Sequence, residues 1–171
     1  MLKSAPKTPK ATRPAMPSDY GIAKGAQGRL EWAWAAERMA AAKNYWIVSV
    51  RPDGRPHAMP VWGVAFDDTV YFSTGHGSRK ALNLANNPAV VVHLESGDET
   101  VVLEGTAVIV TEAAEIARFD DAYAAKYGGI RPGRDMAATS HIYRLNLAVA
   151  FGWAEASFPN SATRWSFAAK G

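Results

Sequence analysis

The arrangement of hydrophobic and polar positions along this chain predicts a protein built mainly from short strands. Stretches rich in Val, Ile, Tyr, Phe and Thr are separated by Gly, Pro, Asn and Asp, which is typical of strands joined by tight turns. The predicted strands cover residues 45–50, 55–66, 69–74, 89–95, 100–110 and 140–150, with an extension of the last one to residue 154.

Two longer stretches carry a helical pattern instead. Residues 30–43 and 112–127 are rich in Ala, Glu and Arg, which favour helices. In the second stretch, Ile116, Phe119 and Tyr123 are spaced three and four residues apart, so this face is expected to pack on the strands. Neither pattern is present in two further segments, which we expect to be irregular: residues 130–139 and 156–167.

The turns between the predicted strands favour antiparallel pairing. Asp53-Gly54 is a strong signal for a hairpin between the first two strands. Pro56 and Pro60 cannot donate a ladder hydrogen bond, so the second strand is expected to be edge-like, bulged or interrupted there. Gly105 is a candidate bulge. We therefore predict a mainly β fold with flanking helices, in which six or seven antiparallel strands close into a barrel.

Charge is distributed unevenly along the chain. The net charge is +3, but residues 1–29 hold six Lys or Arg and one acid, whereas the remainder holds 13 bases and 15 acids. We therefore predict a flexible basic leader over residues 1–29 and a single domain over residues 30–171. Nucleic-acid contact through the leader is the weaker alternative, and no nucleic-acid partner is expected.

Composition excludes several classes of chemistry. The chain has no cysteine, which rules out disulfides and thiolate chemistry and removes the commonest zinc ligand. No apolar run approaches the roughly 20 residues that span a bilayer, and the N-terminus lacks the apolar core of a secretory signal. We expect a cytoplasmic protein with no membrane partner. We also expect no metal site, because metal-like spacing is absent among the four histidines, His57, His76, His93 and His141.

The strongest local signal is the segment TGHGSRKAL, which ends a predicted strand and begins a helix. Gly75 and Gly77 let the backbone turn and approach a ligand closely. Ser78 is placed to cap the helix, and Arg79 and Lys80 add two cations beside unpaired backbone N–H groups. The segment therefore predicts an anion site. An ordinary Ser-capped helix with two solvated bases is the alternative, and the absence of a GxxxxGK[ST] string argues against a nucleoside triphosphate.

Together with its flanking strands, this loop resembles the pyridoxamine 5′-phosphate oxidase superfamily over residues 37–153. The similar stretches are RPDGRPHAMPVWG, VYFSTGHGSRKALNLANNPAVVVHLE and VVLEGTA. The resemblance implies a split β-barrel homodimer with cofactors at the dimer interface. It also implies that Ser78, Arg79 and Lys80 hold the phosphate of FMN or of its deazaflavin analogue, coenzyme F420.

The sequence also departs from the vitamin-oxidase members of this superfamily. Those members carry an Arg and a Lys on the second strand, where this chain reads HAMPVW, and their ring-contacting strand residue corresponds to a position near Thr100. Oxidation of pyridoxamine phosphate is therefore not expected. The chain looks more like the actinobacterial branch of F420-dependent reductases. This resemblance implies hydride transfer between F420 and a conjugated small molecule; the alternatives are an FMN-dependent oxidase or reductase and a non-catalytic flavin, deazaflavin or haem protein.

Further cofactor contacts are expected on the second and third strands. A flat ring needs close backbone approach, and a proline-interrupted strand leaves backbone groups free for it. The expected contacts are Met59, Pro60, Val61 and Trp62, with Ser73 and Thr74 on the next strand and His57 near the phosphate. A bulged strand with a buried Trp62 is the alternative. No catalytic residue is assigned, because hydride chemistry belongs to the ring.

The C-terminal segment supplies the last candidates. Because this segment can approach the cofactor pocket in the resembling branch, Arg164 is expected to meet phosphate or the acidic tail of the cofactor, with Trp165 beside it. In the alternative, Trp165 packs over the barrel and Arg164 pairs with an acidic side chain. Further candidates for contacts with the tail are Arg51, Arg55 and Lys126. His76 is a candidate for contact with cofactor or substrate.

Overall fold

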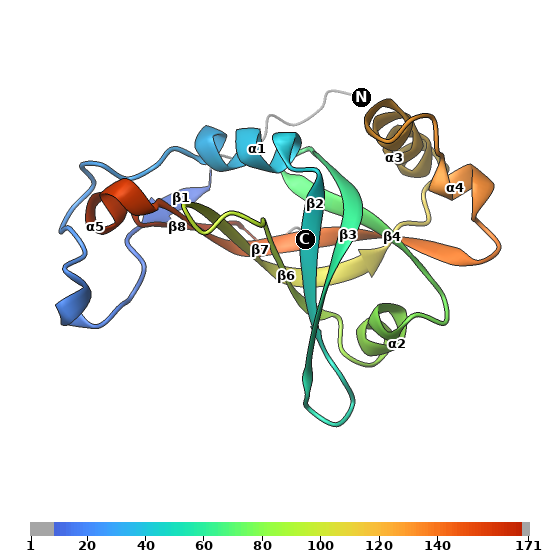
Figure 1. Cartoon of the computed structure of the whole chain (residues 1–171), viewed down its shortest axis with the longest axis horizontal. Helices are drawn as coiled ribbons and strands as arrows, with labels where there is room; N and C mark the ends of the chain where they lie inside the picture. The colour runs from blue at the N-terminus through green and yellow to red at the C-terminus, as the bar shows by residue number, and fades with distance from the viewer. Residues whose placement is uncertain (1–8, 169–171) are drawn as a thin grey trace.

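The computed structural model describes residues 9–168, and its strands form one antiparallel sheet. The strand order is β1-β8-β7-β4-β3-β2-β5-β6, and an additional pairing of β7 with β6 closes the strands from β2 to β7 into a six-stranded barrel (Figure 1). The strands are β1 (Lys10–Thr12), β2 (Asn44–Val50), β3 (Pro56–Phe66), β4 (Thr69–Gly75), β5 (Ala89–His93), β6 (Glu99–Ile109), β7 (Ser140–Ala154) and β8 (Thr163–Ser166). The predicted mainly β barrel is confirmed.

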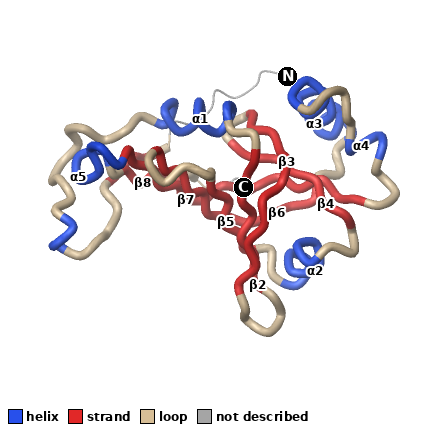
Figure 2. Tube along the Cα trace, viewed as in Figure 1, coloured by secondary structure: helices blue, strands red, loops and turns tan. Residues whose placement is uncertain are grey.

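Helices lie around the sheet rather than within it, as Figure 2 shows. They are α1 (Trp32–Ala41), α2 (Arg79–Asn86), α3 (Ala113–Lys126), α4 (Pro132–Asp135) and α5 (Phe158–Ser161), with 3-10 turns at Ser18–Tyr20 and Glu155–Ser157. The helix α2 lies beside the long β2–β3 hairpin, and α1 and α3 lie at the other end of that hairpin (Figure 1). Over residues 9–168, no helix is both long and apolar enough to cross a membrane.

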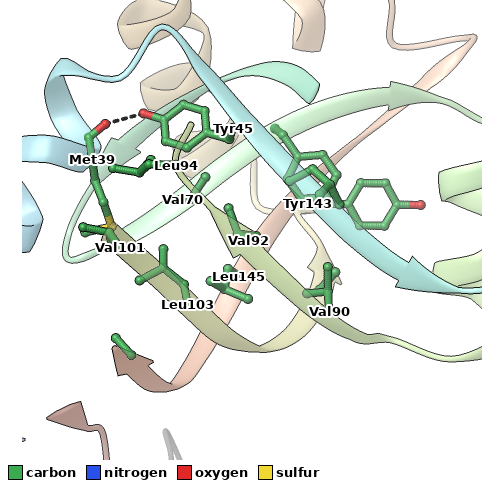
Figure 3. Packing of buried hydrophobic residues seen from close by; sticks show 14 of the residues in the cluster. Met39, Tyr45, Val70, Val90, Val92, Leu94, Val101, Leu103, Tyr143 and Leu145 are labelled. Atoms are coloured by element: carbon green, nitrogen blue, oxygen red, sulfur yellow. Dashed lines mark hydrogen bonds between the residues drawn. The ribbon is translucent and has the colours of Figure 1, made fainter. Parts of the chain in front are cut away.

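The barrel interior holds the main hydrophobic core. Side chains from β2, β4, β5, β6 and β7 meet there, and Val92, Leu103 and Leu145 are among those that solvent does not reach (Figure 3). Burial of such side chains stabilises the fold by about 1.5–3 kcal/mol each. One polar atom in this core is satisfied locally, because the hydroxyl of Tyr45 donates to the carbonyl oxygen of Met39 at 2.5 Å.

A bulge lies at the position predicted for Gly105, but its extra residue, Ala148, is on the partner strand β7. The register between β6 and β7 shifts between Glu104 and Gly105. A Cβ atom at Gly105 would lie 2.1 Å from the carbonyl oxygen of Asn146, so any other residue would force the two strands apart. The glycine therefore allows β6 to bend as the barrel closes.

Residues 130–139 and 156–167 are more ordered than predicted. The first segment contains α4, whose N-terminal amides at Gly133 and Arg134 donate to the buried carboxylate of Asp120. The second segment contains α5 and β8, which pairs with β7 on one side and β1 on the other. Their local sequences carry no clear periodic pattern, and long-range contacts supply the order.

Part of the predicted leader also packs on the domain. The guanidinium of Arg13 donates to four backbone carbonyl oxygens, those of Gly25, Gln27, Asn160 and Ala162, at 2.6–3.1 Å. The strand β1 also pairs with β8, so residues 9–29 of the predicted leader are attached to the domain. Residues 1–8 of the leader lie outside the described residues.

A split between β3 and β4 positions the candidate site. Residues 56–62 of β3 pair with β2 alone, whereas residues 63–66 pair with β4. Because Pro56 and Pro60 are four residues apart, their backbone nitrogen atoms point to the same edge of the strand. This is the free edge, where a missing N–H breaks no ladder hydrogen bond. The predicted edge-like character of this strand is confirmed, and we call the region beside its free edge, toward β4 and α2, the opening (Figure 1).

Candidate anion-binding site

The start of α2 presents groups that suit an anion. The Ser78 hydroxyl accepts a hydrogen bond from the Ala81 amide at 3.1 Å and lies 2.9 Å from the Thr74 hydroxyl. Arg79 and Lys80 occupy the first two positions of the helix, where backbone N–H groups have no intrahelical acceptor. The predicted Ser78 cap is therefore confirmed, and the loop leaves two amides and two cations available to a ligand.

The tip of the β2–β3 hairpin brings further cations to this helix start. Burial of the ring and the charges of Lys80, Arg51 and Arg79, in that order, lower the pKa of His57. The three cations therefore lie near His57, and we call the four groups the cationic cluster. Burial also lowers the pKa of Lys80. In the described part of the chain, none of the four forms an ion pair with a carboxylate.

A single carboxylate lies at the edge of the cluster. Asp53 accepts two hydrogen bonds from the Arg55 guanidinium, at 3.0 and 2.7 Å, and these bonds lower its pKa. The charges of Arg51 and Arg79 lower it further, so Asp53 is near them although it is engaged by Arg55. The cluster as a whole retains an excess of positive charge.

Three buried polar atoms near the cationic cluster have no partner in the part of the chain that the structure describes, so they are compatible with a ligand there. Arg51 Nε, His57 Nδ1 and Asn83 Oδ1 are buried from solvent, yet each has no hydrogen-bond partner among the described residues. Asn83 donates through its other amide atom to Ser49 at 3.0 Å, and Ser49 pairs with His57 across β2 and β3. Because buried polar groups are normally paired, donors and an acceptor left free at one place indicate a ligand.

The ring-contacting candidates on β3 lie on two faces of the strand. His57, Met59 and Val61 stand opposite the buried residues Ser49, Ile47 and Tyr45 of β2, so they share the face on which α2 packs.

The other two β3 candidates, Pro60 and Trp62, point to the opposite face. The Trp62 ring stacks on Tyr127 with centroids 4.7 Å apart and remains 44% exposed. The expected contacts therefore divide into two sets, and Trp62 is not the buried residue of the alternative interpretation.

Distance along the strand separates a charged end of the site from an aromatic end. His57 and Trp62 are five residues apart on β3, which corresponds to about 16 Å at about 3.3 Å per residue. Ser73 and Thr74 lie across the opening at the end of β4, where Thr74 contacts Ser78. The cations and the stacked aromatic rings thus lie at opposite ends and on opposite faces of this segment of β3, and its free edge, which either face can reach, joins them.

The C-terminal candidates are not brought to this site within the chain. Trp165 is 1% exposed and packs in the barrel core against Trp32, with ring centroids 5.4 Å apart. Arg164 donates to the Ser166 hydroxyl on the same strand. β8 lies at the opposite end of the sheet from α2 (Figure 1). Tertiary pairing of β8 places both residues there, which local sequence could not reveal.

A shallow groove of about 450 Å³ lies between α2, β6 and β7. Its exposed apolar residues are Leu82, Val108 and Ile109. His76 also lines it, against His141 with ring centroids 4.1 Å apart and the rings inclined by 39°, and the two rings meet no third metal-binding side chain in the described residues. His76 is therefore placed at the groove, next to the loop of Ser78.

Sequence reasoning missed two residues of the site, Asn83 and Tyr127. Asn83 is fully buried on α2, and a polar residue on the apolar face of a short helix was the available signal. Tyr127 stacks under Trp62 from the end of α3, and no spacing in the sequence relates these two residues.

Comparison with known proteins supports this description. A family model described as pyridoxamine 5′-phosphate oxidase matches residues 34–154, which confirms the resemblance drawn from the sequence. A search of curated proteins found no significant match. Among solved structures, the conserved hypothetical protein Rv2991 from Mycobacterium tuberculosis is 26% identical, with a TM-score of 0.65 over 74% of this chain and 86% of that chain.

Two more distant structures share the fold. An F420 reductase is 20% identical, with a TM-score of 0.52 over 67% of this chain and 94% of that chain. A heme-binding protein from Mycobacterium smegmatis is 15% identical, with a TM-score of 0.60 over 78% of this chain and 62% of that chain. Proteins named for different cofactors therefore share this architecture, and the fold does not choose between them.

Proposed function

Because the chain belongs to the pyridoxamine 5′-phosphate oxidase family, we propose that it is an oxidoreductase that binds coenzyme F420 at the opening between β3 and β4. The single observation that carries this proposal is the cationic cluster beside the start of α2, with its unpaired Arg51 and His57 nitrogen atoms. A phosphate group matches these donors in charge and in hydrogen-bonding capacity.

Each end of the opening has its own role in this proposal. Ser78, Arg79 and Lys80 bind the phosphate, and the free edge of β3 offers backbone groups to the ring. When bound, the deazaflavin supplies hydride transfer to or from a conjugated small molecule. The side chains bind and orient, and none is assigned as an acid or base.

The excess of positive charge favours F420 over FMN. FMN ends in one phosphate, whereas F420 continues beyond its phosphate into an acidic tail. Within the cluster, Arg51 lies on the β2–β3 hairpin rather than on α2, so it is the cation placed to meet a charge beyond the phosphate. FMN is the second candidate, because the same loop would hold its phosphate equally well. Titration of the protein with both cofactors, side by side, distinguishes them.

We include a homodimer in the proposal, as the family resemblance implies. Leu82, Val108 and Ile109 expose apolar surface on the groove beside α2, which a second copy of the chain would cover. Sedimentation measures the mass directly, and a species of one chain mass at micromolar concentration would contradict the dimer.

The central test is removal of the two cations on α2. Arg79→Ala with Lys80→Ala should weaken F420 binding by about 3–5 kcal/mol, because charge-assisted hydrogen bonds contribute about 1.5–3 kcal/mol each. The free energy of unfolding should change little, since neither side chain forms an ion pair among the described residues. Fluorescence titration measures the affinity and urea unfolding the stability. Unchanged affinity in a folded double variant would refute the site.

A further inference from the structure

The last turn of α3 and the residue after it hold the peptide of Gly63 on β3. Gly63 N donates to Tyr127 Oη at 3.0 Å, and Gly63 O accepts from Lys126 Nζ at 2.9 Å and lies 2.7 Å from Tyr127 Oη. The same hydroxyl lies 2.6 Å from the carbonyl oxygen of Lys43. A phenol has one hydrogen and can donate it to only one of these carbonyls at a time. Lys126 is therefore the donor that serves Gly63 O throughout.

This peptide has little freedom to move. A Cβ at Gly63 would lie 2.6 Å from the carbonyl oxygen of Tyr71 and 3.1 Å from the ring of Tyr45, so only glycine fits. Trp62 precedes it and stacks on Tyr127 with the two rings inclined by only 4°. The position of the exposed indole is thus tied to the same contacts that hold Gly63.

Lys126 carries its charge in an aromatic setting. Its Nζ lies 4.8 Å from the ring centroid of Tyr45 and 5.2 Å from that of Tyr127, and it donates to the Tyr45 hydroxyl at 3.2 Å. Within residues 9–168, no carboxylate forms an ion pair with it. The titratable groups that face the Lys126 amine are two phenols, Tyr45 of β2 and Tyr127, the residue after α3.

Burial shifts the pKa values of the amine and of the phenols in opposite directions. It lowers the pKa of Lys126 to about 8 and raises the pKa values of Tyr45 and Tyr127 above their ordinary range. Between pH 7 and 9, the amine is therefore the group in this contact network that changes charge.

From these contacts we propose that Lys126 is a positioning residue for the planar ring of the cofactor, acting through Gly63 and the Tyr127–Trp62 stack. The inference rests on the proposed function, because the cationic cluster lies at the other end of the same free segment of β3. A charge-assisted hydrogen bond is stronger and shorter than a neutral one, so the ammonium holds the strand more firmly than the free amine does. The ring end is therefore best ordered below pH 8 and loosens above it.

The first experiment needs no cofactor. The fluorescence of Trp62, taken as the difference between the protein and its Trp62→Phe variant, is followed from pH 6.5 to 9.5. We expect a transition with a midpoint near pH 8, its absence in Lys126→Met, and a constant low-pH signal in Lys126→Arg, which keeps its charge. Lys43→Met, the matched removal of a nearby exposed lysine side chain, should keep the transition. A transition that persists in Lys126→Met would overturn the proposal.

The second experiment separates the two ends of the opening. Affinities are measured at pH 7 for F420 and for the same deazaflavin chromophore without its phosphate-bearing tail. Lys126→Met should weaken both by the same factor, about tenfold, whereas Arg79→Ala should weaken F420 alone. Equal affinities in the protein and in Lys126→Met would overturn the positioning role, as would a loss confined to F420.

The failures of the two proposals are distinguishable. If the unchanged protein binds neither probe, the proposed function fails and ring positioning falls with it, whatever the Trp62 signal shows. If F420 binds and depends on Arg79 but not on Lys126, the proposed function stands and the positioning role alone is refuted.

Discussion

Arg13, which follows β1 at one end of the sheet, and Arg51, at the β2–β3 hairpin end, show two uses of the same side chain. Arg13 donates to four backbone carbonyl oxygens and fastens the N-terminal segment to α5 and the start of β8. Arg51 leaves a buried Nε without any acceptor in the described residues and sits among other cations. At the first end, the protein itself satisfies the guanidinium. At the second end, no acceptor for Arg51 Nε lies among the described residues, which agrees with the proposed role in binding.

This difference indicates which arginine side chains stabilise the fold and which are available for binding. A guanidinium with internal acceptors contributes to the free energy of unfolding. A guanidinium held among like charges opposes folding slightly and gains an acceptor only from a ligand. Substitutions at the two ends should therefore change different measured quantities.

The largest effect is expected at Arg13. Arg13→Met should lower the free energy of unfolding by about 2 kcal/mol, because it removes four charge-assisted hydrogen bonds, part of which water replaces. F420 affinity should not change. Urea unfolding measures the loss, and Lys10→Met, an exposed cation on β1, serves as the control. An unchanged unfolding midpoint for Arg13→Met would contradict the role assigned to this end.

A smaller effect, on affinity alone, is expected at Arg51. Arg51→Met should weaken F420 binding roughly tenfold, about 1.4 kcal/mol, which is near the lower end of the contribution of one charge-assisted hydrogen bond. Arg55→Met is the matched control on the same hairpin. Its guanidinium is already engaged by Asp53 at an exposed position, so its loss should change affinity by less than about 1 kcal/mol. Larger losses at Arg55 than at Arg51 would reverse the assignment.

The smallest effect concerns pH and His57. Burial and the neighbouring cations lower the pKa of His57, so protonation disfavours the folded protein without ligand, and its contribution to stability falls as pH drops below about 6.5. A bound anion offsets this repulsion and raises the pKa again. F420 binding should therefore take up protons near pH 6 and strengthen by a factor of a few as pH falls.

Calorimetric titration in buffers of different ionisation enthalpy measures this proton uptake. His57→Gln removes the titrating group and should abolish it. Proton release on binding, or uptake that persists in His57→Gln, would show that another group is responsible.

Much of the barrel could be predicted because its signals are local. Residue preferences and the Asp53-Gly54 turn defined β2 to β7, and Gly105 marked the bulge that closes β6 on β7. The Ser78 cap was predictable for the same reason, since a cap bonds an amide three residues along the chain. Strands β1 and β8 were missed because each is only three or four residues long and depends on its pairing partner.

The sequence by itself determined the barrel strands, the turn chemistry and the two cations that follow Ser78, because these depend on neighbours along the chain. Only the tertiary structure decided which cations remain unpaired, that Trp165 belongs to the core and that Lys126 reaches Gly63. The last two outcomes depend on contacts between residues 60 or more positions apart, and all three need a geometry that exists only once the sheet has closed.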